Sequence, residues 1–90
     1  MLELTLIRRA AAGDRQALQA VLEELQERAW RIAGEYTRDR DEAADLAQEI
    51  LIEVCRSLPS LRDPQRLHSW CDTLGQRVCL AWRQRELQAL

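Results

Sequence analysis

The chain has 90 residues, a formal net charge of −2, 13 basic residues that are all arginine, and 15 acidic residues. A chain of this length buries roughly 60 to 65% of the surface that it exposes when unfolded, which allows one hydrophobic core and excludes a second. No apolar run approaches the roughly 18 residues of a membrane span, and the N-terminal sequence lacks the order of a signal peptide, so we expect a cytoplasmic protein that does not touch a membrane.

Two helices are predicted in the first part of the chain. A short helix from about Glu3 to Ala12 ends at Gly13, where a left-handed residue costs little. Asp14 then caps a helix from Arg15 to about Thr37. Apolar residues recur along it at steps of three and four, so one face must be buried. These residues are Leu18, Val21, Leu22, Leu25, Ala29, Ile32, Ala33 and Tyr36.

The third predicted helix opens with a capping box, in which Asp39 is followed three residues later by Glu42. Pro59 ends this helix, because proline cannot continue it. The residues predicted to face inward are Ala43, Leu46, Ala47, Ile50, Val54 and Leu58.

The fourth predicted helix begins with Asp63 as cap and Pro64 at its first position. Gly75, inside the helix, is expected to allow close helix packing. The predicted buried stripe comprises Leu67, Trp70, Cys71, Leu74, Val78 and Ala81.

These elements predict an all-α fold, namely a compact bundle of three long helices plus a short N-terminal helix in one domain over residues 1–90. Trp30 and Trp70 are expected in the core, and Trp82 at its edge or against a further domain. We expect one core that contains Leu22, Leu25, Leu46, Ile50, Val54, Trp70 and Leu74.

Catalytic or metal-binding chemistry is not expected. His68 is the single histidine, and it is interpreted as a solvated or boundary residue at the start of the fourth helix. The glycines are isolated, so no phosphate-binding loop is present. The three cysteines lack any C-x-x-C spacing and are interpreted as reduced thiols, so neither a metal nor a cofactor is predicted.

The third predicted helix carries an outward stripe of Asp45, Gln48, Glu49 and Ile52, continued by Arg56. An exposed isoleucine beside two carboxylates and an amide suits a partner helix, although such residues also occur on a solvated helix face.

The charge of the chain is asymmetric, because residues 1–56 carry 8 Arg and 12 acids, net −4, and residues 57–90 carry 5 Arg and 3 acids, net +2. This distribution suits a domain that contacts protein with one part and phosphate with another. Ordinary solubility is the alternative reading for the arginines. One face of the fourth helix is predicted to carry Arg66, Ser69, Thr73, Gln76, Arg77 and Arg83.

Three segments resemble, in order and spacing, region 2 of the bacterial sigma-70 family, of the extracytoplasmic-function (ECF) type. They are AGDRQAL at 12–18, RDRDEAADLAQEI at 38–50 and RSLPSLRDPQRLHSW at 56–70, and the resemblance covers about residues 5–86. The most specific block contains Asp41, Ala43, Asp45, Leu46, Gln48 and Glu49. A complete factor of this type has a second, helix-turn-helix domain, for which 90 residues leave no room.

The resemblance implies a transcription initiation module. Asp45, Gln48 and Glu49 would contact the clamp coiled coil of the largest catalytic (β′) subunit of RNA polymerase, and Ile52 would add apolar contact. The promoter −10 element would be bound mainly as single-stranded non-template DNA, with an unstacked base captured by the loop over residues 60–65. An anti-sigma factor is a further possible partner. The DNA-binding residues would be Arg62, Gln65, Arg66, Ser69, Thr73, Gln76, Arg77 and Arg83.

The chain departs from this family mainly where DNA would be handled. Aromatic residues are usual at four positions that here hold Leu51, Cys55, Leu61 and Leu67; Arg77 and Ala81 replace the frequent Asn and Asp; and Glu53 stands where a basic residue is common. Aromatic side chains stack on open bases, so promoter melting is in question. Two alternatives therefore stay open: a sigma-like decoy or regulator that binds polymerase or an anti-sigma factor without opening promoters, and a generic helical interaction domain.

Overall fold

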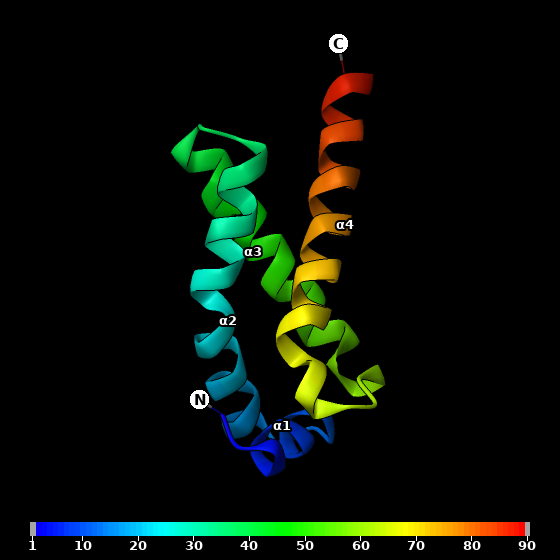
Figure 1. Cartoon of the computed structure of the whole chain (residues 1–90). Helices are drawn as coiled ribbons and strands as arrows, with labels where there is room; N and C mark the ends of the chain where they lie inside the picture. The colour runs from blue at the N-terminus through cyan, green and yellow to red at the C-terminus, as the bar shows by residue number, and fades with distance from the viewer. Residues whose placement is uncertain (1, 90) are drawn as a thin grey trace.

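The computed structural model describes residues 2–89 and contains four α-helices with no strand in that range. The helices are α1 (Leu4–Ala11), α2 (Arg15–Tyr36), α3 (Arg40–Ser57) and α4 (Leu67–Gln88), and two 3-10 turns, η1 (Leu58–Ser60) and η2 (Pro64–Arg66), join α3 to α4. Helices α2 and α4 run in the same direction, α3 runs against them, and α1 lies across one end (Figure 1). The predicted all-α bundle is confirmed. No helix within residues 2–89 combines the length and apolarity that a membrane crossing needs.

The turn between α1 and α2 forms as the sequence predicts. Gly13 has a φ of 106°, the left-handed conformation that glycine adopts without steric cost. The carboxylate of Asp14 accepts a hydrogen bond of 3.1 Å from the backbone N–H of Ala17 and so caps α2. That bond, together with the Arg9 guanidinium 2.6 Å away, lowers the pKa of Asp14.

The N-terminus of α3 differs in detail from a capping box. Asp39 accepts hydrogen bonds from the N–H groups of Asp41 and Glu42, as predicted. The return contact is indirect: Glu42 accepts a 2.8 Å bond from the Thr37 hydroxyl, whose oxygen accepts the N–H of Asp39 at 3.2 Å. Thr37 therefore relays the contact that Glu42 was expected to make directly with the Asp39 backbone.

The fourth helix starts later than predicted. Asp63 caps the 3-10 turn η2 through a 3.0 Å bond from the N–H of Gln65, and α-helical geometry begins only at Leu67. Pro64 is buried at the first position of η2, where its missing N–H has no cost. The two short turns hold the connection between α3 and α4 in a defined shape.

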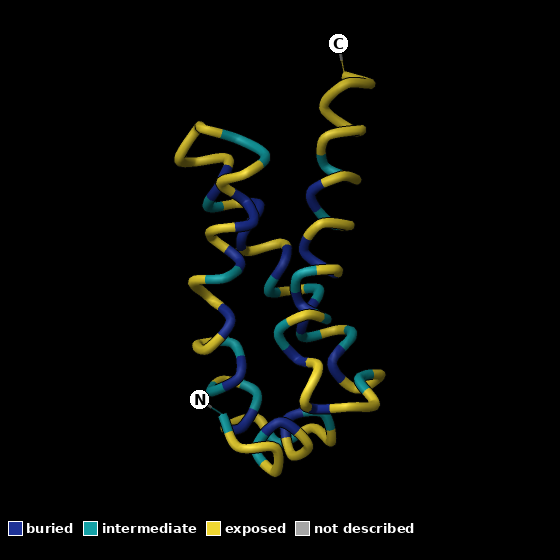
Figure 2. The backbone as a smooth tube through the Cα atoms, in the orientation of Figure 1, coloured by how far each residue is buried: buried dark blue, intermediate teal, exposed yellow. Residues whose placement is uncertain are grey.

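The expected single core is wrong, because the structure contains two clusters. The first lies toward α1 and the α3–α4 connection, and the second toward the opposite end of α2 and α3 (Figure 2). Leu25, Val54 and Leu74 belong to the first cluster, with Leu22 and Trp70 half-buried at its edge. Leu46 and Ile50 belong to the second, and the half-buried Leu51 packs against both. In an elongated bundle of 45 × 21 × 20 Å, no single centre is within reach of all seven residues.

Gly75 marks the close crossing of α2 and α4 that the sequence predicts. A Cβ atom on Gly75 would lie 3.0 Å from Cδ1 of Ile32, which would have to shift slightly, and 3.5 Å from Cδ1 of Ile50, which is ordinary van der Waals contact. Two polar contacts also join α2 to α4: Arg28 binds Asp72 at 3.3 Å, and His68 lies 3.4 Å from Glu24. The crossing fixes the position of α4 against both other long helices.

Two residues predicted to be buried are exposed. Trp30 is 48% exposed, because it lies beside rather than on the buried stripe of α2 that contains Ala29 and Ile32. Ala81 faces solvent, and Cys79 takes a buried place on α4, because the crossing at Gly75 rotates the buried face. Trp82 is half-buried at the edge of the second cluster, as expected.

The cysteines are free thiols, as predicted. Cys71 and Cys79 are fully buried, and burial raises the pKa of each to about 11, so both thiols are protonated at neutral pH and unreactive. Cys55 is half-buried on α3. Nowhere in residues 2–89 do three or more potential ligand side chains group in a way that could hold a metal ion.

Candidate functional site

The predicted outward stripe of α3, which we call the α3 stripe, consists of Asp45, Gln48, Glu49 and Ile52 and lies on the solvent-facing side of the helix. Asp45, Gln48 and Glu49 are exposed, and Ile52 is 48% exposed. This orientation follows from the sequence, because Leu46, Ile50 and Val54 occupy the opposite side of the same helix and are buried. The four predicted residues therefore form one continuous surface.

A shallow groove between α2 and α3, which we call the α2–α3 groove, flanks one side of this stripe. It has a volume of about 400 Å³ and brings Trp30 and Gln26 of α2 next to Gln48 and Ile52 of α3. Trp30 was not predicted as a surface residue. The signal was present, since Trp30 is absent from the three-and-four pattern of the buried face of α2. With Trp30, the stripe acquires an apolar border.

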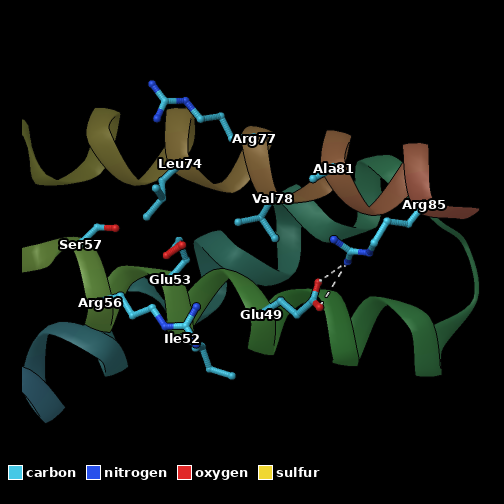
Figure 3. A pocket seen from close by; sticks show the side chains of 10 residues that line it. All are labelled: Glu49, Ile52, Glu53, Arg56, Ser57, Leu74, Arg77, Val78, Ala81 and Arg85. Atoms are coloured by element: carbon cyan, nitrogen blue, oxygen red, sulfur yellow. Dashed lines mark hydrogen bonds and ion pairs between the residues drawn. The ribbon is translucent and has the colours of Figure 1, made fainter.

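A second groove, the α3–α4 groove, flanks the other side of the stripe (Figure 3). Its volume is about 560 Å³, and Leu74 and Val78 of α4 face α3 across it. Glu49 closes one end, because both of its carboxylate oxygens lie 3.5 Å from the guanidinium of Arg85. Ile52 lines both grooves and thus forms the ridge between them. The Glu49–Arg85 contact was not predicted from the sequence.

A third hollow, which we call the loop hollow, lies where the α3–α4 connection meets the start of α4. It has a volume of about 460 Å³ and is lined by Ser60, Leu61, Arg62, Asp63, Arg66, Ser69, Trp70 and Thr73. Four of the predicted DNA-binding residues, Arg62, Arg66, Ser69 and Thr73, come together here. Gln65 is exposed nearby in η2 but does not line the hollow.

Local hydrogen bonds hold the walls of the loop hollow. The Ser60 hydroxyl donates to the carbonyl of Ser57 at 2.6 Å, and the Thr73 hydroxyl donates to the carbonyl of Ser69 at 3.2 Å. Trp70 adds one large aromatic surface, half-buried against the first core cluster. Sequence reasoning assigned Trp70 to the core alone and therefore missed its place in this hollow.

The remaining basic residues of α4 do not share one face, which corrects the prediction. Arg77 lines the α3–α4 groove, and its guanidinium points away from α3 (Figure 3). The guanidinium of Arg83 lies 4.7 Å from the ring centre of Tyr36, on the side of α4 that meets α2. Arg77 and Arg83 are six residues apart, and side chains at that spacing on an α-helix point about 120° away from each other. Gln76 is exposed and, seven residues before Arg83, points in nearly the same direction as Arg83.

Comparison with known proteins gives one family match. The family model described as Sigma-70 region 2 matches residues 21–87. No curated protein and no solved structure matches the chain. The matched range contains the α3 stripe, both grooves, the loop hollow, α2 from Val21 onward and nearly all of α4.

Proposed function

Because the chain belongs to the sigma-70 region 2 family, a family of non-enzymatic domains that act in transcription with RNA polymerase and promoter DNA, we propose that it is an initiation module of the ECF type. In this proposal, the α3 stripe docks on the clamp coiled coil of the β′ subunit and the loop hollow takes part in binding the −10 element. The observation that carries the proposal is the α3 stripe itself, which is continuous, exposed and bordered by Trp30.

The stripe has the chemistry of a helix-docking surface. The carboxylates of Asp45 and Glu49 and the amide of Gln48 can accept charge-assisted hydrogen bonds from arginines on a partner helix, which fixes register and orientation. Ile52 and Trp30, each 48% exposed and lining the same α2–α3 groove, supply apolar area beside the polar contacts. An exposed tryptophan next to an exposed isoleucine is not required by the fold of this chain.

The loop hollow has the chemistry of a site for an unstacked base. Its open shape gives access from solvent, Trp70 provides an aromatic surface, and Arg62 and Arg66 provide cations beside it. Arg77 lies further along α4 and would contact the backbone of the same strand. In this proposal, DNA crosses the face of the bundle that lies next to the docking surface.

The second candidate function is the decoy or regulator that docks without opening promoters. The absence of the usual aromatic residues favours it: Leu61 lines the loop hollow where an aromatic would stack, and Leu67 is 1% exposed and belongs to the core. The net charge of −2 also disfavours binding of DNA by the domain alone. The two candidates share the docking surface and differ only in the use of the loop hollow.

Fluorescence anisotropy with a labelled non-template −10 oligonucleotide separates these candidates. The initiation module is expected to bind single-stranded DNA weakly at low salt, with affinity that falls steeply toward physiological salt. Arg77→Ala is expected to weaken binding of all sequences and to lower the salt slope by about one unit, whereas Arg62→Ala is expected to reduce sequence preference.

The control for this measurement is Arg31→Ala, which removes an exposed arginine of α2 outside the loop hollow and both grooves. It is expected to change the affinity little. If polymerase is bound and the oligonucleotide still does not bind at low salt, the decoy is the better account.

A further inference from the structure

Glu53 is a half-buried carboxylate of α3 that the proposed docking contacts do not use. It lines the α3–α4 groove, and its carboxylate lies in the space between the two helices (Figure 3). The neighbouring Glu49 is bound by Arg85, but no basic nitrogen of residues 2–89 lies within 4.0 Å of the Glu53 carboxylate. A carboxylate in a partly desolvated groove gains most from a cation brought by another molecule.

The walls of the groove are apolar next to this carboxylate. Leu74 and Val78 face α3 from the opposite helix, and Ser57 closes the end away from Glu49. Of the three arginines that line the groove, Arg85 is engaged by Glu49, and Arg77 directs its guanidinium away from α3. Arg56 is exposed on the same helix as Glu53 without forming an ion pair with it. Apolar walls around one carboxylate match a long side chain with a cationic end.

We propose that the α3–α4 groove receives one arginine or lysine side chain from the polymerase helix that docks on the α3 stripe. The aliphatic part of that side chain packs on Leu74 and Val78, and its cation binds Glu53. This inference rests on the proposed docking function and extends its surface by one groove. The groove is continuous with the stripe, because Glu49 and Ile52 belong to both.

The carboxylate of Glu53 disfavours nucleic acid at this position, although the groove as a whole is lined by three arginines and two glutamates. Phosphate groups are repelled by a carboxylate, so DNA that follows Arg77 on the outer side of α4 has no favourable contact with Glu53. A partner helix that binds this chain through the groove must therefore supply the cation for Glu53.

The test is isothermal titration calorimetry of a β′ clamp coiled-coil fragment with the wild-type domain and with Glu53→Gln, which keeps the size of the side chain and removes its charge. Loss of one charge-assisted contact is expected to raise Kd by about 10-fold or more and to make the salt dependence of Kd shallower. The matched control is Glu27→Gln, an exposed glutamate of α2 that lines none of the three cavities, and it is expected to leave Kd within about 2-fold.

The other outcomes would reject either the groove contact or the docking function. Equal Kd values for wild type and Glu53→Gln, together with loss of binding in Asp45→Arg, would reject the groove and leave docking through the stripe intact. No binding by the wild-type domain would reject the docking function itself. Unchanged Kd with an equal loss of thermal stability in Glu53→Gln and Arg56→Gln would show that Glu53 serves an ion pair within α3, which also rejects the groove.

Discussion

Replacement of Asp45 by arginine is expected to lower the affinity of the domain for the β′ clamp coiled coil by about 100-fold or more. Asp45 is exposed at the N-terminal end of the α3 stripe, and its side chain forms no hydrogen bond or ion pair within residues 2–89. Reversal of its charge removes an acceptor for a partner arginine and places two cations together, a change that costs several kcal/mol at an interface. The fold has no need of the carboxylate, so the melting temperature is expected to stay nearly constant.

Titration calorimetry with the clamp fragment measures this effect, and circular dichroism monitors the fold. Glu27→Arg is the matched control, because it makes the same charge reversal on the exposed surface of α2 away from the stripe. Equal loss of affinity in both variants would indicate a general effect of net charge, and unchanged affinity in Asp45→Arg would remove the stripe from the interface.

Replacement of Ile50 by alanine is expected to lower the free energy of unfolding by about 2 to 5 kcal/mol. Ile50 is fully buried in the second core cluster, and its Cδ1 atom lies against the crossing of α2 and α4 at Gly75. The cavity left by this change would be walled by three helices that cannot all move inward. A domain of 90 residues has a total stability of roughly 5 to 15 kcal/mol, so this single change removes a large share of it.

Urea denaturation followed by circular dichroism gives the two free energies. Ile52→Ala removes the same atoms two residues further along α3, where the side chain is 48% exposed, and is expected to change stability by no more than about 0.5 kcal/mol. Both variants remove the same atoms, one from a buried and one from an exposed isoleucine, so the difference between their stability losses reports the effect of burial. A similar stability loss for both would contradict the orientation of α3 in the bundle.

Features that depend only on residues close together in the chain were predictable from the sequence. Gly13, Asp14 and Pro59 set the ends of their helices through local geometry, and the buried face of α3 follows from a three-and-four pattern that no other element disturbs. The α3 stripe was predictable for the same reason, because its residues occupy the remaining face of one helix. Such features need no knowledge of how the helices cross.

Features that depend on the crossing of helices were not predictable from the sequence. The approach of α4 to Ile32 at Gly75 decides that Cys79 is buried and Ala81 exposed. The same approach places Arg83 over Tyr36, away from Arg77. These arrangements depend on helix-crossing geometry, which the periodicity of one helix does not contain. The half-buried position of Glu53 belongs to this group.

Docking through α3 can be observed directly in an NMR titration of the isoleucine-methyl-labelled domain with the clamp coiled-coil fragment. The chain has four isoleucines, of which Ile52 is exposed on the α3 stripe, whereas Ile7, Ile32 and Ile50 are buried. If the domain docks through the α3 stripe, the Ile52 methyl signal shifts as the complex forms, and Ile7, in α1 outside the family match, stays unchanged. A complex that moves Ile7 and leaves Ile52 unchanged, or the absence of any complex, would contradict docking through α3.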